Sequence, residues 1–144
     1  MRAIIAVVAC LVAASLAIAG APRFKVCSTP NALFQNAQVH SEDANWRPGT
    51  TVHFTLDATT TESIADGNIH TDAWFDGMEA ANKNDNMCTY EGTPISCPIA
   101  PGQHSWRFPF EIPSVPWSAP LTSKSQWTTG AGKEIMCMEL EVDL

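Results

Sequence analysis

Four cysteines are the residues whose types and spacing most clearly suggest chemistry: Cys27, Cys88, Cys97 and Cys137. A close pair such as Cys88 and Cys97 is found in redox motifs, in metal sites and in structural disulfides. The four spacings match no short metal-ligand pair, which argues against a zinc site. An even number of cysteines indicates disulfides in a secreted chain, and three pairings are open. The simplest pairing joins Cys88 to Cys97 locally and leaves Cys27 for Cys137.

Residues 1–19 predict a secretory signal, which is the context that disulfides need. Arg2 supplies a positive charge, the stretch after it is almost wholly apolar, and small residues precede a cleavage point before Gly20. An uncleaved membrane anchor is the alternative, although the apolar run is short for a membrane span. Cleavage would remove a fifth cysteine, Cys10. The prediction is one mature domain, residues 20–144, that is secreted to the extracellular space or delivered to the lysosomal lumen.

Histidines and carboxylates are the other candidates for chemistry, and they form no recognisable catalytic set. The four histidines are scattered, and no nucleophile elbow, zinc-protease motif or phosphate-binding glycine loop occurs. His70 and Asp72 place two metal-ligand types on one side of a strand, but such a pair is more often a solvated strand face. We therefore predict that the protein is not an enzyme and uses no cofactor and no metal ion.

The charge balance disfavours several classes of partner. Without Arg2, seven Lys and Arg remain against fifteen Asp and Glu, which gives a formal net charge of −8. No basic patch occurs, so neither nucleic acid nor stable docking on anionic membranes is expected.

Alternating apolar residues predict the strands that must position these side chains. Four stretches have one apolar face of period two: residues 51–58, 68–75, 104–113 and 136–144. Turn residues such as Asp76-Gly77 separate the strands, and the polar residues 79–87 predict a loop. Pro109 within a strand pattern favours a sheet edge or a bulge. Short strands at this spacing predict an all-β antiparallel sandwich in one domain.

Large aromatic rings are numerous for a sandwich of this size: Phe54, Phe75, Trp106, Phe108, Phe110 and Trp127. A packed core is the simpler explanation for any single ring. The other explanation is that the sheets stand apart and enclose a cavity for an apolar ligand. Periodicity cannot separate the two, because residues that line a core and residues that line a cavity show the same pattern. A third alternative is an extracellular glycan- or protein-binding sandwich with a filled core, whose five tryptophans form a surface platform.

The order of motifs along the chain resembles the MD-2-related lipid-recognition family, the ML domain, whose members include the Niemann–Pick type C2 sterol carrier. The resemblance covers nearly the whole mature chain. It rests on four pieces: "RFKVC", "RPGTTVHFTLDATTTESIADGNI", "CTYEGTPISCPIAPG" and "IMCMELEVDL".

The resemblance implies an immunoglobulin-like β-sandwich of two antiparallel sheets with an apolar cavity between them. It also implies the disulfides Cys27–Cys137 and Cys88–Cys97. The implied activity is non-enzymatic binding and transfer of a sterol, phospholipid or glycolipid, as in intracellular or lysosomal sterol transport. Transient contact with a membrane or a carrier protein, and a monomeric state, are expected. By position, twelve residues are expected to bind the lipid: Phe54, Leu56, Ile69, Phe75, Trp106, Phe108, Phe110, Ile112, Trp127, Met138, Leu140 and Val142.

Overall fold

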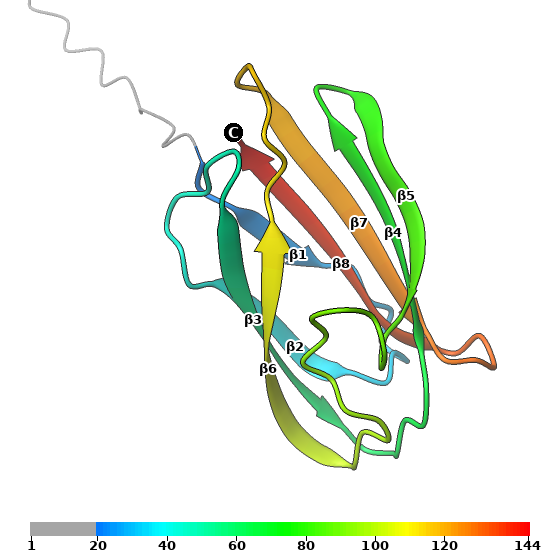
Figure 1. Cartoon of the computed structure of the whole chain (residues 1–144). Coiled ribbons are helices and arrows are strands. Elements are labelled where there is room, and N and C mark those ends of the chain that lie inside the picture. Colours follow the sequence, from blue (N-terminus) through cyan, green and yellow to red (C-terminus); the bar gives the residue numbers. More distant parts are fainter. Residues whose placement is uncertain (1–19) are drawn as a thin grey trace, which may run out of the picture.

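The computed structural model describes residues 20–144, which fold into two packed antiparallel sheets (Figure 1). The strands are β1 Arg23–Val26, β2 Gln35–Ser41, β3 Thr51–Thr60, β4 Asn68–Phe75, β5 Met78–Asn86, β6 Gly102–Glu111, β7 Pro120–Thr128 and β8 Glu134–Asp143. One sheet has the order β1-β8-β7-β4-β5 and the other has the order β2-β3-β6. The described residues contain no helix, and the predicted all-β sandwich is confirmed. The predicted signal, residues 1–19, lies outside the described residues.

The strand β3 shows why the period-two pattern predicted strands correctly. Val52, Phe54 and Leu56 are buried, whereas His53 and Thr55 between them are partly exposed. Successive side chains of a strand point to opposite faces, so one face of β3 packs toward the other sheet. The strands predicted at β4, β6 and β8 are present as well.

Proline and glycine mark the margins of the sheets. Pro109 lies in β6, an edge strand of the smaller sheet. This position confirms the prediction, because proline has no N–H to donate to a second neighbouring strand. Asp76 and Gly77 have φ angles of 52° and 74° and form the turn between β4 and β5. Positive φ at two central residues gives a tight hairpin whose twist matches that of its strands. The predicted turn at this position is confirmed.

The prediction of a loop at residues 79–87 is wrong, because most of this segment belongs to β5. The strand pairs with β4 from Asn68↔Asn86 to Phe75↔Met78 and forms the outer strand of the larger sheet. Polar residues occupy both of its faces, and most of them are exposed. The apolar alternation that identified the other strands is therefore absent from this one.

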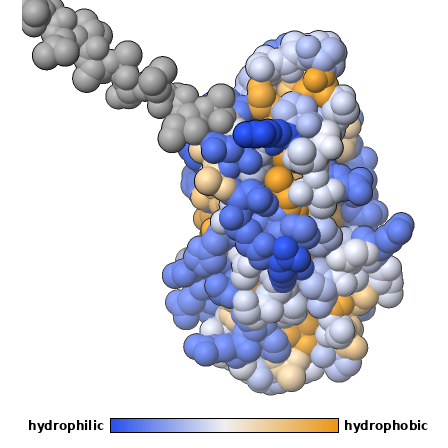
Figure 2. Space-filling model, turned by 60° about the vertical axis from the view of Figure 1, so that its left-hand side comes forward, coloured by the Kyte–Doolittle hydropathy of each residue, from blue (hydrophilic) through white to orange (hydrophobic). Residues whose placement is uncertain are grey.

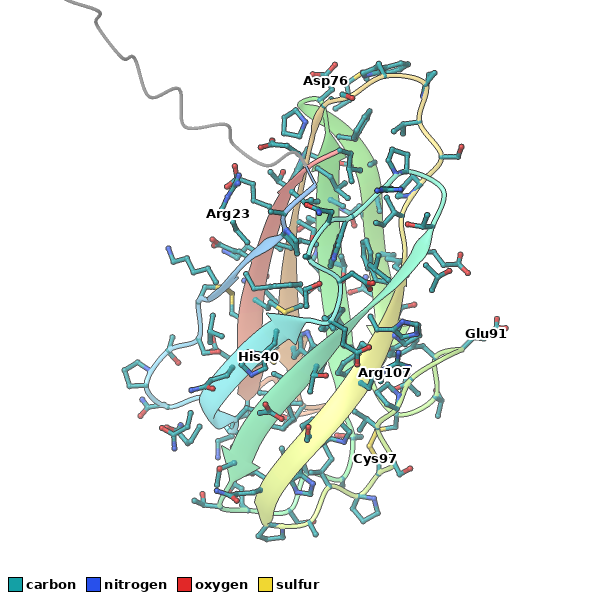
Figure 3. The ribbon with its side chains drawn as sticks, turned by 90° about the vertical axis from the view of Figure 1, so that its left-hand side faces the viewer. Arg23, His40, Asp76, Glu91, Cys97 and Arg107 are labelled. Atoms are coloured by element: carbon teal, nitrogen blue, oxygen red, sulfur yellow. A yellow bond between two sulfur atoms is a disulfide. The ribbon has the colours of Figure 1, made fainter. Side chains whose placement is uncertain are left out.

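The sandwich is closed along one long edge and open along the other. β1 and β2, which belong to opposite sheets, come close together, whereas β5 and β6 do not. Figure 3 shows the two sides, with Arg23 of β1 on the closed side and Arg107 of β6 toward the open side. This asymmetry decides where a molecule could enter between the sheets.

Two disulfides fasten the structure, and they are the pairs that the family resemblance implies. Cys27–Cys137 joins the end of β1 to its neighbour β8 in the same sheet, on the closed side. Cys88–Cys97 closes a loop within the connection between β5 and β6, on the open side.

Buried apolar side chains form two clusters. The first includes Phe34, Leu56 and Met87, and we call it the lower cluster because it takes in residues of the β5–β6 connection, which runs through the lower part of Figure 1. The second, the upper cluster, includes Trp46 and Val142. On the face shown in Figure 2, hydrophobic residues reach the surface only in small separate areas among hydrophilic ones.

Candidate ligand cavity

A cavity of about 330 Å³ lies between the two sheets and is lined by members of both clusters. Its lining comes from β1 and β3 to β8, and from the connections on either side of β6. The residues are Phe24, Phe54, Ile69, Thr71, Ala73, Ala80, Ala81, Lys83, Asp85, Tyr90, Phe108, Pro109, Phe110, Glu111, Pro113, Leu121, Ser123, Ser125, Trp127, Met138 and Leu140. Exposed residues of both β5 and β6 belong to this lining, so the cavity opens along the β5–β6 edge.

Aromatic and aliphatic side chains make the inner wall. Phe108 stacks on Phe54 with ring centroids 5.2 Å apart, and it meets Trp127 edge-on at 5.8 Å. All three side chains are buried, and Ile69 and Met138 extend the wall onto the larger sheet. Such a wall suits the apolar part of a ligand.

Three polar groups interrupt this wall. Thr71 and Ser125 face each other across β4 and β7, and their hydroxyl oxygens lie 3.1 Å apart in a hydrogen bond. The buried Nε1–H of Trp127 has no hydrogen-bond partner among the described residues. A buried donor without a partner costs free energy, and an acceptor oxygen in a ligand would offset that cost.

Charged side chains gather where the cavity opens. Lys83 Nζ and Asp85 Oδ2 on β5 lie 3.0 Å apart, and Glu111 lies on β6. Tyr90, from the connection between these strands, completes the polar rim. Burial raises the pKa of the Tyr90 hydroxyl; a hydrogen bond with Thr93 partly offsets this, and the Asp85 carboxylate adds to the increase. Tyr90 is therefore a neutral hydrogen-bond donor at neutral pH.

The β5–β6 connection covers the lower part of the open edge. Its apolar side chains are buried in the lower cluster: Met87, Ile95 and Ile99. A Cβ added at Gly92 would lie 3.5 Å from Cγ of Pro109, so the connection runs close to β6. Figure 3 places Glu91 and Cys97 of this connection beside β6. The Cys88–Cys97 disulfide thus closes a loop of the connection that partly covers this edge.

Seven of the twelve residues predicted to bind the ligand line the cavity: Phe54, Ile69, Phe108, Phe110, Trp127, Met138 and Leu140. The other five pack in or against the two clusters and are absent from the lining: Leu56 and Trp106 in the lower cluster, and Phe75, Ile112 and Val142 in the upper cluster. Eleven of the twelve lie on inward strand faces, and Ile112 follows the end of β6. Position along the strand, which periodicity does not reveal, separates the two groups.

Sequence reasoning missed other lining residues. Leu121, Ser123 and Ser125 alternate inward along β7 with Trp127, and this period-two signal was present in the sequence. Phe24 packs against both clusters from a strand of four residues, which is too short for a clear pattern.

The predicted pair of metal-ligand types, His70 and Asp72, lies on β4, on the face of the larger sheet opposite the cavity. His70 Nδ1 lies 2.9 Å from Asn84 Oδ1, and its Nε2 lies 3.1 Å from Asp72 Oδ2. Within residues 20–144, no group of three or more His, Cys, Asp or Glu side chains is arranged to hold a metal ion. Nor do these residues include a helix long and apolar enough to span a membrane.

The fold and the cavity define a β-sandwich that can hold an apolar molecule between its sheets. Residues 22–144 match the model of the ML domain family, and the chain belongs to that family.

The individual proteins that resemble this chain share little sequence identity with it. A Dictyostelium discoideum protein named for phosphatidylglycerol and phosphatidylinositol transfer is 26% identical over 83 residues, which are 58% of this chain and 58% of that protein. Chicken MD-1, crystallised with lipid IVa, superposes with a TM-score of 0.62 at 14% identity, over 85% of this chain and 88% of its own. A Niemann–Pick type C2 protein from the Japanese carpenter ant superposes with a TM-score of 0.56 at 11% identity, over 84% of this chain and 98% of its own. The two structures share the fold with this chain.

Proposed function

We propose that the protein binds a lipid between its two sheets and transfers it without covalent chemistry. The observation that carries this proposal is the cavity of about 330 Å³, walled by apolar side chains and open at one edge. Membership of the ML domain family, and a relative named for phospholipid transfer, support the same function. The proposed ligand is a sterol or a phospholipid, with a glycolipid as a further member of the class.

The proposed mechanism is partition of the lipid between water, membrane and cavity. Burial of an alkyl chain gains about 0.8 kcal/mol for each methylene group removed from water. A chain of about a dozen groups would gain on the order of 10 kcal/mol before the costs of ordering protein and ligand. Met138 in the wall has a flexible thioether side chain that can adapt to different chain shapes.

Exposed apolar residues near the mouth supply a means of transient membrane contact. Trp117 and Met78 are 49% and 59% exposed. They lie in the β6–β7 connection and at the start of β5, and Pro113 of the same connection lines the cavity. Tryptophan favours the boundary between lipid and water. The chain's net negative charge argues that this contact does not depend on a basic patch.

The positions of the tryptophans argue against the alternative of a glycan- or protein-binding sandwich with a filled core. Trp46 and Trp127 are buried, and Trp106 is half-buried against Phe34, with ring centroids 5.2 Å apart. They therefore do not form one surface platform, and the space between the sheets is not filled.

The proposed location is the extracellular space or the lysosomal lumen, reached through the secretory pathway. Disulfides persist in oxidising compartments, and two of them fasten this domain.

The test is native mass spectrometry of the protein purified from its own source, before and after lipid extraction. We expect a lipid adduct that disappears on extraction, and an extracted protein that binds a fluorescent sterol or phospholipid. Absence of a co-purifying lipid, together with absence of binding to either probe, would contradict the proposal.

A further inference from the structure

One buried hydrogen-bond donor in the cavity wall has no acceptor within the protein. Trp127 is 3% exposed, and its indole Nε1–H is without a hydrogen-bond partner among residues 20–144. No other buried side-chain nitrogen or oxygen of these residues lacks a partner. Buried polar groups nearly always form a hydrogen bond, and a missing one costs free energy. This exception calls for an acceptor that the protein itself does not supply.

The neighbours of this indole are apolar. Trp127 meets Phe108 edge-on with ring centroids 5.8 Å apart, and its ring centroid lies 6.2 Å from that of Phe34. Its partners across the neighbouring strands are Ile69 of β4 and Met136 of β8. An aromatic ring accepts an N–H only weakly, and an aliphatic side chain does not accept one. The surrounding wall therefore does not replace the missing acceptor.

Strand register places two hydroxyl groups beside the indole. Ser125 lies two residues before Trp127 on β7, so both side chains point to the same face of the sheet, and both line the cavity. Thr71, the partner of Ser125 across β4, lines the cavity as well. We call Thr71, Ser125 and Trp127 the donor patch.

The donor patch can give two hydrogens to a ligand. Thr71 Oγ1 and Ser125 Oγ lie 3.1 Å apart, so one hydroxyl donates to the other, and the second hydroxyl keeps its hydrogen for another acceptor. The indole N–H supplies the other hydrogen. Lys83, which pairs with Thr71 across β5, already has its ammonium 3.0 Å from the Asp85 carboxylate. The patch therefore suits an uncharged group that has an acceptor oxygen.

We infer that the bound lipid carries an acyl ester, and that its carbonyl oxygen accepts a hydrogen bond from Trp127 Nε1–H inside the cavity. The inference rests on the proposed lipid-binding function and names the ligand class, an acyl lipid in place of a sterol. A carbonyl oxygen offers two lone pairs and brings no donor that would need a partner of its own. It is uncharged, so its burial costs less than that of a carboxylate. The alkyl chain beside it can lie along the apolar wall at Phe54, Phe108 and Met138.

The test compares two uncharged lipids that differ only at the ester. One is monooleoylglycerol, and the other is the ether of the same head and chain, in which a methylene group replaces the carbonyl. Binding to the delipidated protein is measured by calorimetric titration below the concentration at which the lipids aggregate. We expect the ester to bind about tenfold more tightly, because its carbonyl satisfies the buried donor.

Variants make the test specific to the indole N–H. Trp127→Phe keeps an aromatic ring and removes the donor, so the preference for the ester should fall to about twofold or less. Trp106→Phe is the matched control, because Trp106 packs against the same lower cluster and lies outside the cavity lining. This control should keep the tenfold preference.

A spectroscopic measurement on the wild-type protein covers the case in which Trp127→Phe fails to fold. The five tryptophans give separate indole N–H signals in a proton–nitrogen NMR spectrum, and the signal of Trp127 is identified by its loss in Trp127→Phe or by elimination with the other four Trp→Phe variants. The ester should move the Trp127 proton signal to higher frequency, as a new hydrogen bond does. The ether should move it much less.

The outcomes separate this inference from the proposed function. Equal affinity of the wild-type protein for ester and ether, or the same Trp127 shift with both, means that water or a neighbouring ring meets the N–H, and it overturns the inference. Binding of a sterol probe with no binding of the ester overturns it as well, and both results leave lipid binding intact. Failure of both lipids, and of the sterol and phospholipid probes, overturns the proposed function and the inference with it.

Discussion

The two long edges of the sandwich differ although both are built from the same two sheets. Along one edge, β1 and β2 approach each other, and the Cys27–Cys137 disulfide ties β1 to β8. Along the other edge, β5 and β6 stay apart, and a disulfide-bonded connection covers only part of the gap. Phe24 of β1 reaches between the sheets and packs against both clusters, whereas the inner face of β5 presents Lys83 and Asp85 to the opening.

This difference between the edges indicates that an open cavity in a small sandwich depends on where the buried side chains are packed most closely. The two clusters and the closed edge hold the sheets together, so the middle of the open edge can remain unfilled. Four changes test this division of roles.

Removal of each disulfide should have unequal effects on stability. The Cys27–Cys137 bridge spans a sequence separation of 110 and the Cys88–Cys97 bridge a separation of 9. Restricting the unfolded chain should be worth about 5 kcal/mol for the long closure and about 3 kcal/mol for the short one. Urea unfolding of the two double Cys→Ala variants measures the loss in the free energy of unfolding for each disulfide. Equal losses would mean that the closed edge is not the better fastened one.

Within the lower cluster, truncation should cost more at a residue that does not line the cavity than at one that does. Leu56 is 1% exposed within the lower cluster, so Leu56→Ala should lower the free energy of unfolding by about 3 kcal/mol. Met138 already borders open space, and Met138→Ala should lower it by about 2 kcal/mol, because fewer neighbouring atoms are lost.

The same two variants, Leu56→Ala and Met138→Ala, should also differ in their affinity for lipid. Leu56→Ala should leave it nearly unchanged, since Leu56 does not line the cavity, whereas Met138→Ala should change it. Unfolding curves measure the stability of both variants, and titrations with a fluorescent lipid probe measure their affinity. A larger stability loss at Met138 would mean that the cavity wall is packed as tightly as the rest of the lower cluster.

A large side chain at the mouth should block binding without unfolding the protein. Ala81 lies on the cavity side of β5, and Ala81→Trp should weaken lipid binding about tenfold with little change in thermal stability. Asn82 is exposed and lies outside the cavity lining, so Asn82→Trp is the matched control. If both variants bind as well as the wild type, lipid does not enter through the β5–β6 edge.

A surface ion pair outside the mouth should matter least. Arg107 Nε and Nη2 donate to Glu42 Oε1 and Oε2 at 2.6 and 2.9 Å, and this hydrogen bonding lowers the pKa of Glu42. A lowered pKa stabilises the fold above the pKa of the unfolded chain, and that effect fades as the pH falls through the folded value. Because the pair is exposed, Glu42→Gln should barely change the melting temperature at neutral pH and should leave lipid binding unchanged. A marked change in either measurement would show that the outer face of β6 supports the open edge.

The sequence predicted most of the scaffold because strand periodicity and cysteine number report directly on local geometry. Val52, Phe54 and Leu56 alternate since β3 has one buried face. The ordered motifs then implied the disulfide pairs through the family resemblance.

The cavity was harder to predict, for a physical reason. Leu56 and Phe54 lie on the same face of β3 and both belong to the lower cluster, yet Phe54 lines the cavity and Leu56 does not. Their sequence environments are alike, and the distance between the sheets, which a single strand cannot encode, separates them. The sequence predicts a loop at Lys83 and Asp85, because an edge strand at a hydrated mouth carries no apolar alternation.

Photolabelling tests the central claim, that lipid lies between the sheets inside the open edge, most directly. The delipidated protein is loaded with an oleoyl lipid that carries a diazirine in its chain, irradiated, and mapped by peptide mass spectrometry. We predict labels on the cavity wall at Phe108, Met138 and Leu140, and much weaker labelling in Ala81→Trp. Labels confined to the exposed Trp74 or Trp117, and unchanged in that variant, would contradict it.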